Sequence, residues 1–109
     1  MCIRDSTRLR HPNIVQYLGC VVSPPTYCLV LEFCDAGDLY RCLRFPTPPG
    51  LLLRVARAVA SGMAYLHRRH IMHRDLKSSN VYAAAGAARA RARRRRRTRT
   101  RIRLSLIHI

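Results

Sequence analysis

Residues 83–103 consist almost wholly of alanine, arginine, glycine and threonine, and they limit how much of this chain can form a core. Ten of the 20 arginines lie between Arg89 and Arg103, and this stretch contains no acidic residue. Alanine and arginine are good helix formers, but a block of like charge without an apolar stripe should stay disordered or only loosely helical. The formal net charge of +16 is therefore mainly a property of this tail, and any core must come from residues 7–82.

The two ends of the chain, Met1–Ser6 and Leu104–Ile109, can be encoded by one short DNA element in opposite orientations. The first hexapeptide can be written as ATGTGTATAAGAGACAG, whose reverse complement translates as LSLIHI. The string resembles the end of a transposon-based sequencing adapter, so we expect both hexapeptides to be processing scars outside the fold. The expected division is a scar at 1–6, a folded segment at 7–82, a low-complexity tail at 83–103 and a second scar at 104–109.

Two apolar runs rich in β-branched residues, 14–22 and 27–33, predict an antiparallel hairpin. Pro24 and Pro25 lie in the short segment between the runs, where they stay outside the hydrogen-bonded ladder. Residues 7–13 precede the first run and contain His-Pro-Asn, so a helix would have to end there because proline disfavours helix in the residue before it.

Helical patterns follow the predicted hairpin. Residues 34–44 begin with turn formers and continue as a short helix, with Asp38 as its N-cap. After a proline-rich linker at 45–50, residues 51–69 show the spacing of an amphipathic helix with basic residues in its last turn. The apolar positions of this helix are Leu52, Val55, Ala56, Val59, Ala60, Met63 and Leu66. Residues 71–82 are polar and irregular, and the whole pattern predicts an α+β fold.

The cysteines and histidines give little support to a metal or disulfide framework. The five cysteines form no C-x-x-C pair, and one of them, Cys2, belongs to a suspected scar. Reduced thiols are therefore expected, with a cytoplasmic location, or a nuclear one if the arginine-rich tail is genuine. The spacing of His67, His70 and His73 by three suits a metal site, but the end of a helix explains the first two. No run approaches the roughly 18 apolar residues that span a membrane, so no membrane association is expected.

The octapeptide HRDLKSSN, His73–Asn80, resembles the catalytic loop of the eukaryotic protein kinases. Three flanking stretches resemble the same family in the family's order. LRHPNIVQYLG is similar to the end of helix αC and the fourth strand, YCLVLEFCDAGDLYRCLR to the fifth strand, hinge and helix αD, and VASGMAYLHRRHIMHRDLKSSNV to helix αE and the catalytic loop. The resemblance covers residues 7–81 and implies a partial protein-kinase-like fold.

The resemblance also indicates which kinases this segment is most similar to. Lys77 followed by Ser78 and Ser79 is similar to the serine/threonine kinases. Together with HPNIVQYLG, it resembles the tyrosine-kinase-like group, meaning the Raf-like and mixed-lineage kinases or a related mitogen-activated protein kinase kinase kinase. The partners implied for the intact parent are a protein substrate and ATP, with Mg²⁺ as the metal cofactor.

The resemblance implies roles for five residues of the loop. Asp75 would meet the attacking protein hydroxyl, Lys77 would offset charge on the transferred phosphate, and Asn80 would hold a metal ion. His73 would anchor the loop, and Arg74 would pair with a phosphorylated activation loop. These residue types suit phosphoryl transfer, which depends on positioning and charge neutralisation more than on covalent chemistry.

The resemblance places the ATP-binding residues at the end of the second apolar run and after the catalytic loop. The implied hinge and floor residues are Leu31, Glu32, Phe33, Cys34 and Tyr82. Leu31 would be the gatekeeper, the Glu32 carbonyl and the Cys34 backbone would face adenine, and Tyr82 would form the floor. Gly37 would allow the turn into the short helix.

Other residues that the family uses have no counterpart in this sequence. Lys77 is the only lysine and Glu32 the only glutamate, so the ATP-binding lysine and its glutamate partner are missing. No G-x-G-x-x-G loop occurs, and Asp75 is the last acidic residue, so the principal metal-binding carboxylate is missing too. We therefore expect a fragment of a serine/threonine kinase that is inactive alone and leaves apolar faces uncovered.

Two alternatives stay open. The arginines of Arg89–Arg103 could bind nucleic acid without sequence preference, since they neutralise phosphates but offer no aromatic side chain for base stacking. The same arginines could act as a nuclear-localisation patch. The other alternative is a pseudokinase or scaffold, but the intact His73, Arg74, Asp75 and Asn80 count against it.

Overall fold

The computed structural model describes residues 8–84 and 101–104, with only the backbone described at 101, 102 and 104. The expected scar at 1–6 lies outside these residues, and so do residues 105–109 of the second expected scar, 104–109. The elements in chain order are β1 (Tyr17–Ser23), β2 (Thr26–Leu31), α2 (Leu39–Cys42), α3 (Leu51–Arg68), the 3-10 turn η1 (Ser78–Asn80), β3 (Val81–Ala84) and β4 (Arg101–Leu104). The α+β class is confirmed. No helix in the described part is long and apolar enough to cross a membrane.

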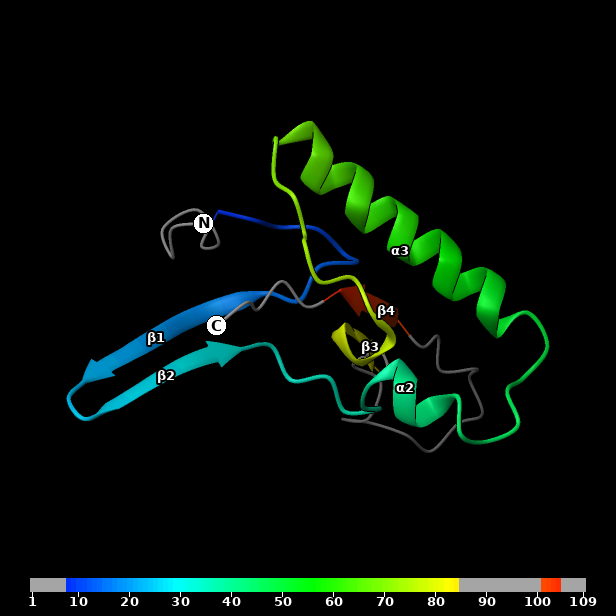
Figure 1. Ribbon diagram of the computed structural model, residues 1–109, viewed down its shortest axis with the longest axis horizontal. Helices are drawn as coiled ribbons and strands as arrows, with labels where there is room; N and C mark the ends of the chain where they lie inside the picture. Colours follow the sequence, from blue (N-terminus) through cyan, green and yellow to red (C-terminus); the bar gives the residue numbers. More distant parts are fainter. Residues whose placement is uncertain (1–7, 85–100, 105–109) are drawn as a thin grey trace, which may run out of the picture.

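Strands β1 and β2 form the antiparallel hairpin that the two apolar runs predicted. The register runs from Tyr17 opposite Leu31 to Ser23 opposite Thr26, so the two prolines make the turn and lie outside the ladder. The hairpin extends away from α3 and from the other strands (Figure 1). All residues from 20 to 30 are exposed, which confirms that the chain leaves apolar faces uncovered.

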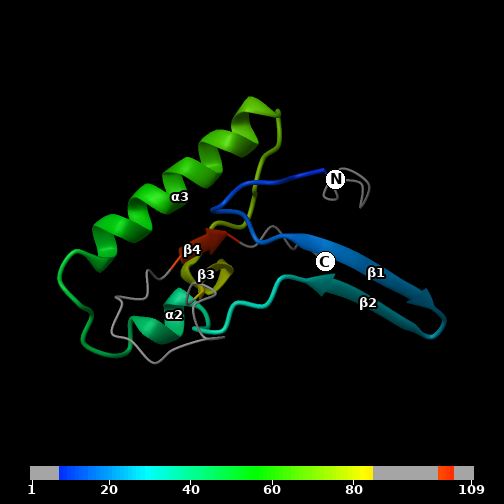
Figure 2. The ribbon, with the colours of Figure 1, turned by 180° about the vertical axis from the view of Figure 1, so that it is seen from behind.

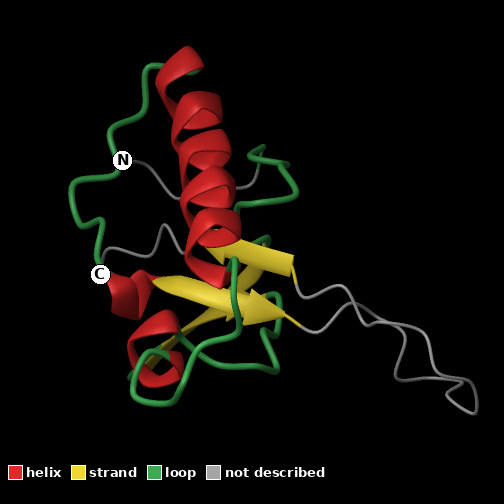
Figure 3. Cartoon of the chain, turned by 90° about the vertical axis from the view of Figure 1, so that its right-hand side faces the viewer, coloured by secondary structure: helices red, strands yellow, loops and turns green. Residues whose placement is uncertain are grey.

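Helix α3 confirms the predicted amphipathic helix, but only part of the predicted stripe is buried. Its buried residues are Val55, Gly62 and Leu66, and half-buried Val59 and Met63 extend this face. The predicted core positions that are exposed are Leu52, Ala56 and Ala60. The prediction was wrong for these three because the packing partners of α3 lie on one side of it, which leaves the other half of the stripe open (Figures 1 and 3).

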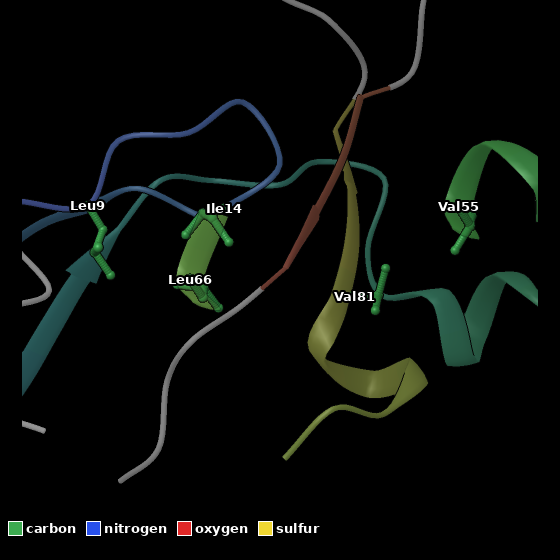
Figure 4. Close-up of a cluster of buried hydrophobic side chains, with 5 residues drawn as sticks. All are labelled: Leu9, Ile14, Val55, Leu66 and Val81. Carbon is green, nitrogen blue, oxygen red and sulfur yellow. The ribbon is translucent and has the colours of Figure 1, made fainter. Parts of the chain in front are cut away.

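The core joins three parts of the chain that are distant in sequence. Leu9 and Ile14 precede the hairpin, Val55 and Leu66 come from α3, and Val81 begins β3; each is at most 7% exposed. Leu9, Ile14 and Leu66 lie together, and Val81 and Val55 extend the cluster away from the hairpin (Figure 4). Burial of these side chains packs α3 onto the β3–β4 pair, with β4 beside the helix and Val81 of β3, the strand that directly follows the predicted catalytic loop, in the cluster.

The described part of residues 7–13 contains no helix end. Residues 8–13 form turns and extended chain, and His11 accepts a hydrogen bond from the Ile14 backbone N–H through its carbonyl, at 3.1 Å. Residues 8–13 are not helical themselves, and the residues before them, where a preceding helix would end, lie outside the described part.

The tail predicted to be disordered or loosely helical contributes two strand segments. Ala83 and Ala84 belong to β3, and Arg101–Arg103 belong to β4, which pairs with β3 from Val81 opposite Leu104 to Ala84 opposite Arg101. The prediction is wrong for these residues; 85–100 lie outside the described part. Leu104, assigned to a scar, completes β4. The strand pair lies between α3 and α2 (Figures 1 and 2), so packing overrides the low β-propensity of these residues.

Candidate active site

The chain reverses direction after α3 through two residues in the left-handed region. His70 has φ +57° and Arg74 has φ +63°, which is uncommon for residues other than glycine. The Ile71 backbone N–H donates to the Leu66 carbonyl at 3.0 Å and closes the first reversal. The second lies between His73 and Asp75, so the backbone turns sharply inside the predicted catalytic loop.

His73 lies beneath the loop that carries Asp75. It is 3% exposed, and its Nδ1 accepts a hydrogen bond from the Asp75 backbone N–H at 3.2 Å. Because Nδ1 accepts, it carries no proton, and the ring proton is assigned to Nε2. The buried ring therefore fixes the position of the Asp75 backbone through this hydrogen bond.

Asp75, Lys77 and Asn80 come together at the surface. Asp75 Oδ2 accepts a hydrogen bond from Asn80 Nδ2 at 2.8 Å and lies 3.0 Å from Lys77 Nζ. Asn80 Nδ2 also donates to the Asp75 carbonyl at 2.9 Å, because the turn η1 brings Asn80 back towards Asp75. The Lys77 side chain is 57% exposed and that of Asp75 33%, so the carboxylate is held in place yet remains accessible to a substrate.

Asn80 can contribute a single oxygen ligand to a metal ion. Its nitrogen is committed to Asp75, which leaves the amide oxygen as the ligating atom, and neutral amide oxygen suits hard divalent cations. Within residues 8–84 and 101–104 there is no group of three His, Cys, Asp or Glu side chains that could hold a metal ion. The donor set present therefore fits a metal that takes most of its ligands from bound phosphates and water.

The predicted hinge continues directly from β2. The Glu32 backbone N–H donates to the Gln16 carbonyl at 2.8 Å, and Leu31 is half-buried as the last residue of the strand. Phe33 is 85% exposed and Cys34 is half-buried. Burial, followed by the negative charge of Glu32, raises the pKa of the Cys34 thiol, which therefore stays protonated at neutral pH.

Strand β3 runs against the segment that follows the hinge. The Ala36 N–H donates to the Ala83 carbonyl at 3.1 Å, and the Ala83 N–H donates to the Gly37 carbonyl at 2.9 Å. Tyr82 forms a β-bridge with Asp38, next to Gly37, whose φ of +75° confirms the predicted turn. Tyr82, the predicted floor residue, thus lies beside the chain that leaves the hinge, and it follows Asn80 by two positions. Asp38 accepts a hydrogen bond from the Arg41 N–H at 2.9 Å, which confirms the predicted N-cap.

One charged residue near the hinge was not predicted from the sequence. Arg103 Nη1 donates to Glu32 Oε2, and the Arg103 side chain is only 12% exposed. The two residues are 71 positions apart, and Arg103 is one of ten arginines in a low-complexity stretch. No local pattern distinguishes it from the other nine.

Comparison with known proteins identifies the class of protein to which this segment belongs, a protein kinase. The family described as protein tyrosine and serine/threonine kinase matches residues 4–89, and this chain belongs to that family. Over 81 residues the chain is 44% identical to mitogen-activated protein kinase kinase kinase 12 of Rattus norvegicus, a match covering 72% of this chain and 9% of the relative. It is 46% identical to mitogen-activated protein kinase kinase kinase 13-A of Xenopus laevis and 44% identical to mitogen-activated protein kinase kinase kinase 13 of Mus musculus. Both matches cover 72% of this chain and 8% of the relative.

These relatives confirm the sequence-based assignment to a serine/threonine-kinase segment of the mixed-lineage type. The chain spans less than a tenth of the length of these curated relatives.

Proposed function

We propose that this chain is the part of a protein serine/threonine kinase that holds the catalytic loop and the adenine-binding hinge. The intact enzyme would transfer the γ-phosphoryl group of ATP to a serine or threonine hydroxyl of a protein, with a divalent metal ion, Mg²⁺, as cofactor. The observation that carries the proposal is the cluster of Asp75, Lys77 and Asn80, joined by contacts of 2.8–3.0 Å on a loop anchored by a buried histidine.

In this mechanism the Asp75 carboxylate accepts a hydrogen bond from the substrate hydroxyl and then its proton. The hydroxyl oxygen forms a bond to the γ-phosphorus while the bond between that phosphorus and the β–γ bridging oxygen breaks, and ADP leaves. Lys77 offsets negative charge on the transferred group, and Asn80 offers its amide oxygen to the metal. The metal, when bound, neutralises phosphate charge in the transition state.

The hinge would bind adenine through its backbone, with the Glu32 carbonyl and the Cys34 backbone as hydrogen-bonding groups. Leu31 would close the rear of the site and Tyr82 would lie under the base. The pairing of β3 with residues 36–38 supports this arrangement, because it ties the floor strand to the chain leaving the hinge. Arg74 would pair with a phosphorylated activation segment of the intact kinase.

The other expectations stay predictions. Most of the arginine-rich tail lies outside the described residues, and nothing tests nucleic-acid binding by it. The thiols of Cys20, Cys28, Cys34 and Cys42 are free. Free thiols suit a reducing compartment, and for the intact kinase we therefore propose a cytoplasmic location.

A chimeric kinase tests the proposal. Residues 8–84 would replace the matching segment of Mus musculus mitogen-activated protein kinase kinase kinase 13, and transfer from radiolabelled ATP to a protein substrate would be measured. We expect activity in the chimera and a loss of about a hundredfold or more with Asp75→Asn, since a positioned base contributes at least that much. Arg57→Gln, a charge-neutralising change on the exposed surface of α3, should leave activity nearly unchanged. A folded chimera without transfer, or one that tolerates Asp75→Asn, would refute the assignment.

A further inference from the structure

Arg103 connects three segments of the chain through one guanidinium group. It lies on β4, and its Nη1 donates both to Glu32 Oε2 at the end of β2 and to the Ile14 carbonyl just before β1, at 3.4 Å for the latter. The same Glu32 oxygen accepts a hydrogen bond from the Gln16 backbone N–H at 3.1 Å. Both ends of the β1–β2 hairpin therefore meet at Arg103, which belongs to the strand pair below α3.

The base of the hairpin is where such a connection has the most effect. The hairpin extends away from α3 and from the β3–β4 pair when seen from the front and from behind (Figures 1 and 2). Residues 20–30 are all exposed, so in the described part of the chain little besides the partner strand packs on the outer part of the hairpin. Its orientation depends on the contacts at its base, next to the hinge.

We propose that Arg103 is a positioning residue that clasps the hairpin and the hinge onto the β3–β4 pair. The proposal does not depend on the proposed kinase function. A guanidinium suits this task because its donors are fixed in a planar fork and its charge is permanent. Loss of the Arg103–Glu32 pair should leave α3 packed against the β3–β4 pair while the hinge moves relative to Tyr82.

Burial separates this ion pair from the other ion pairs in the described part of the chain. The side chains of Arg103 and Glu32 are 12% and 25% exposed, whereas Arg41 is 81% exposed in its pair with Asp38. Water screens an exposed pair, so such pairs contribute little, while a shielded pair is costly to break from one side only.

The clasp is not optimised for stability. Arg103 Nε is buried and has no hydrogen-bond partner, and such an unsatisfied donor destabilises the folded state. An apolar side chain of similar length in place of Arg103 would therefore offset part of the loss by removing that donor, although Glu32 would then keep only its bond from Gln16. The main role of the pair is to select one arrangement of the hairpin and the hinge.

Amide hydrogen exchange of the full chain, followed by mass spectrometry, tests the proposal. Arg103→Glu is compared with Glu32→Arg, with the double charge swap, and with Arg57→Glu, a matched charge reversal on the exposed surface of α3. Each single reversal should speed exchange at the hairpin base and hinge by about tenfold, because a partly buried charge is left opposite a like charge. The swap should restore most of the protection, and Arg57→Glu should leave it unchanged.

Protection of the buried face of α3 reports whether a variant is still folded. If Arg103→Glu loses that protection too, Arg103→Met decides the question, because it removes the charge and keeps an apolar stem of similar length. With Arg103→Met, faster exchange at the hinge while α3 stays protected supports the clasp. Unchanged exchange at the hinge in a folded single variant, or a swap no better than the single reversals, overturns it.

Discussion

Asn80 closes the catalytic loop around Asp75 with one nitrogen atom, so its replacement tests the geometry of the site directly. Asn80→Ala removes the 2.8 Å bond to the Asp75 carboxylate and the 2.9 Å bond to the Asp75 carbonyl. A hydrogen bond to a charged group contributes about 1.5–3 kcal/mol and a neutral one about 0.5–1.5 kcal/mol. Both bonds share one donor atom and Asp75 is one-third exposed, so we expect a loss of about 2 kcal/mol rather than the sum.

Urea denaturation followed by the helical signal of α3 measures this loss as a change in the free energy of unfolding. Ser79→Ala is the matched control, because it truncates a half-buried polar side chain in the same turn; its effect should stay within about 0.5 kcal/mol. Asn80→Asp should lower the free energy of unfolding more than Asn80→Ala does, since it replaces the donor with a second carboxylate facing Asp75.

The order of the three variants carries the test. If Asn80→Ala were no more destabilising than Ser79→Ala, the two bonds would not hold the loop. If Asn80→Asp were the most stable of the three, the loop would not bring the two side chains together at all. Either result would remove the structural basis for assigning Asp75 and Asn80 to one site.

Four further outcomes are expected. Leu66→Ala, at a fully buried position, should lower the free energy of unfolding by about 3–5 kcal/mol in the same urea assay. Asp38→Ala removes the N-cap of α2 and should reduce stability by about 1 kcal/mol, seen as a lower urea midpoint. Burial, followed by the positive charge of Arg68, lowers the pKa of His11. The unfolded chain therefore binds a proton at this histidine more strongly than the folded chain does. Stability should therefore fall as the pH drops below about 6.5, and His11→Gln should flatten that dependence in urea midpoints. The chain as it stands should transfer no phosphate from labelled ATP to a generic protein substrate; turnover that Asp75→Asn abolishes would contradict this.

The elements that the sequence predicted correctly have local causes. Two prolines between β-branched runs suffice for the hairpin, and Asp38 satisfies a backbone donor only three residues away. The loop from His73 to Asn80 closes on itself by hydrogen bonds between residues two and five positions apart. Such short-range contacts are visible in the sequence because the residues that make them lie next to one another.

The features that could not be predicted depend on contacts with residues distant in the sequence. Periodicity gave the apolar spacing of α3, but Leu52 and Val55 fit the same stripe and only Val55 is buried. The buried side is decided by Leu9 and Ile14, which lie some forty residues earlier in the chain. The Arg103–Glu32 contact was hidden for the same reason, since composition alone makes all ten arginines of the tail equivalent.

This division between local and distant contacts has a consequence for the site itself. The proposed catalytic loop is held by its own hydrogen bonds and by the buried His73, whereas the hinge is held by Gln16 and Arg103 and the segment after it by β3. The two halves of the site should therefore respond separately. Arg103→Glu should disturb the hinge and spare the amide of Asp75, while Asn80→Ala should release that amide and leave the hinge protected. If either substitution loosened both halves equally, the site would be one cooperative unit, and the separate origins argued for its two halves would be wrong.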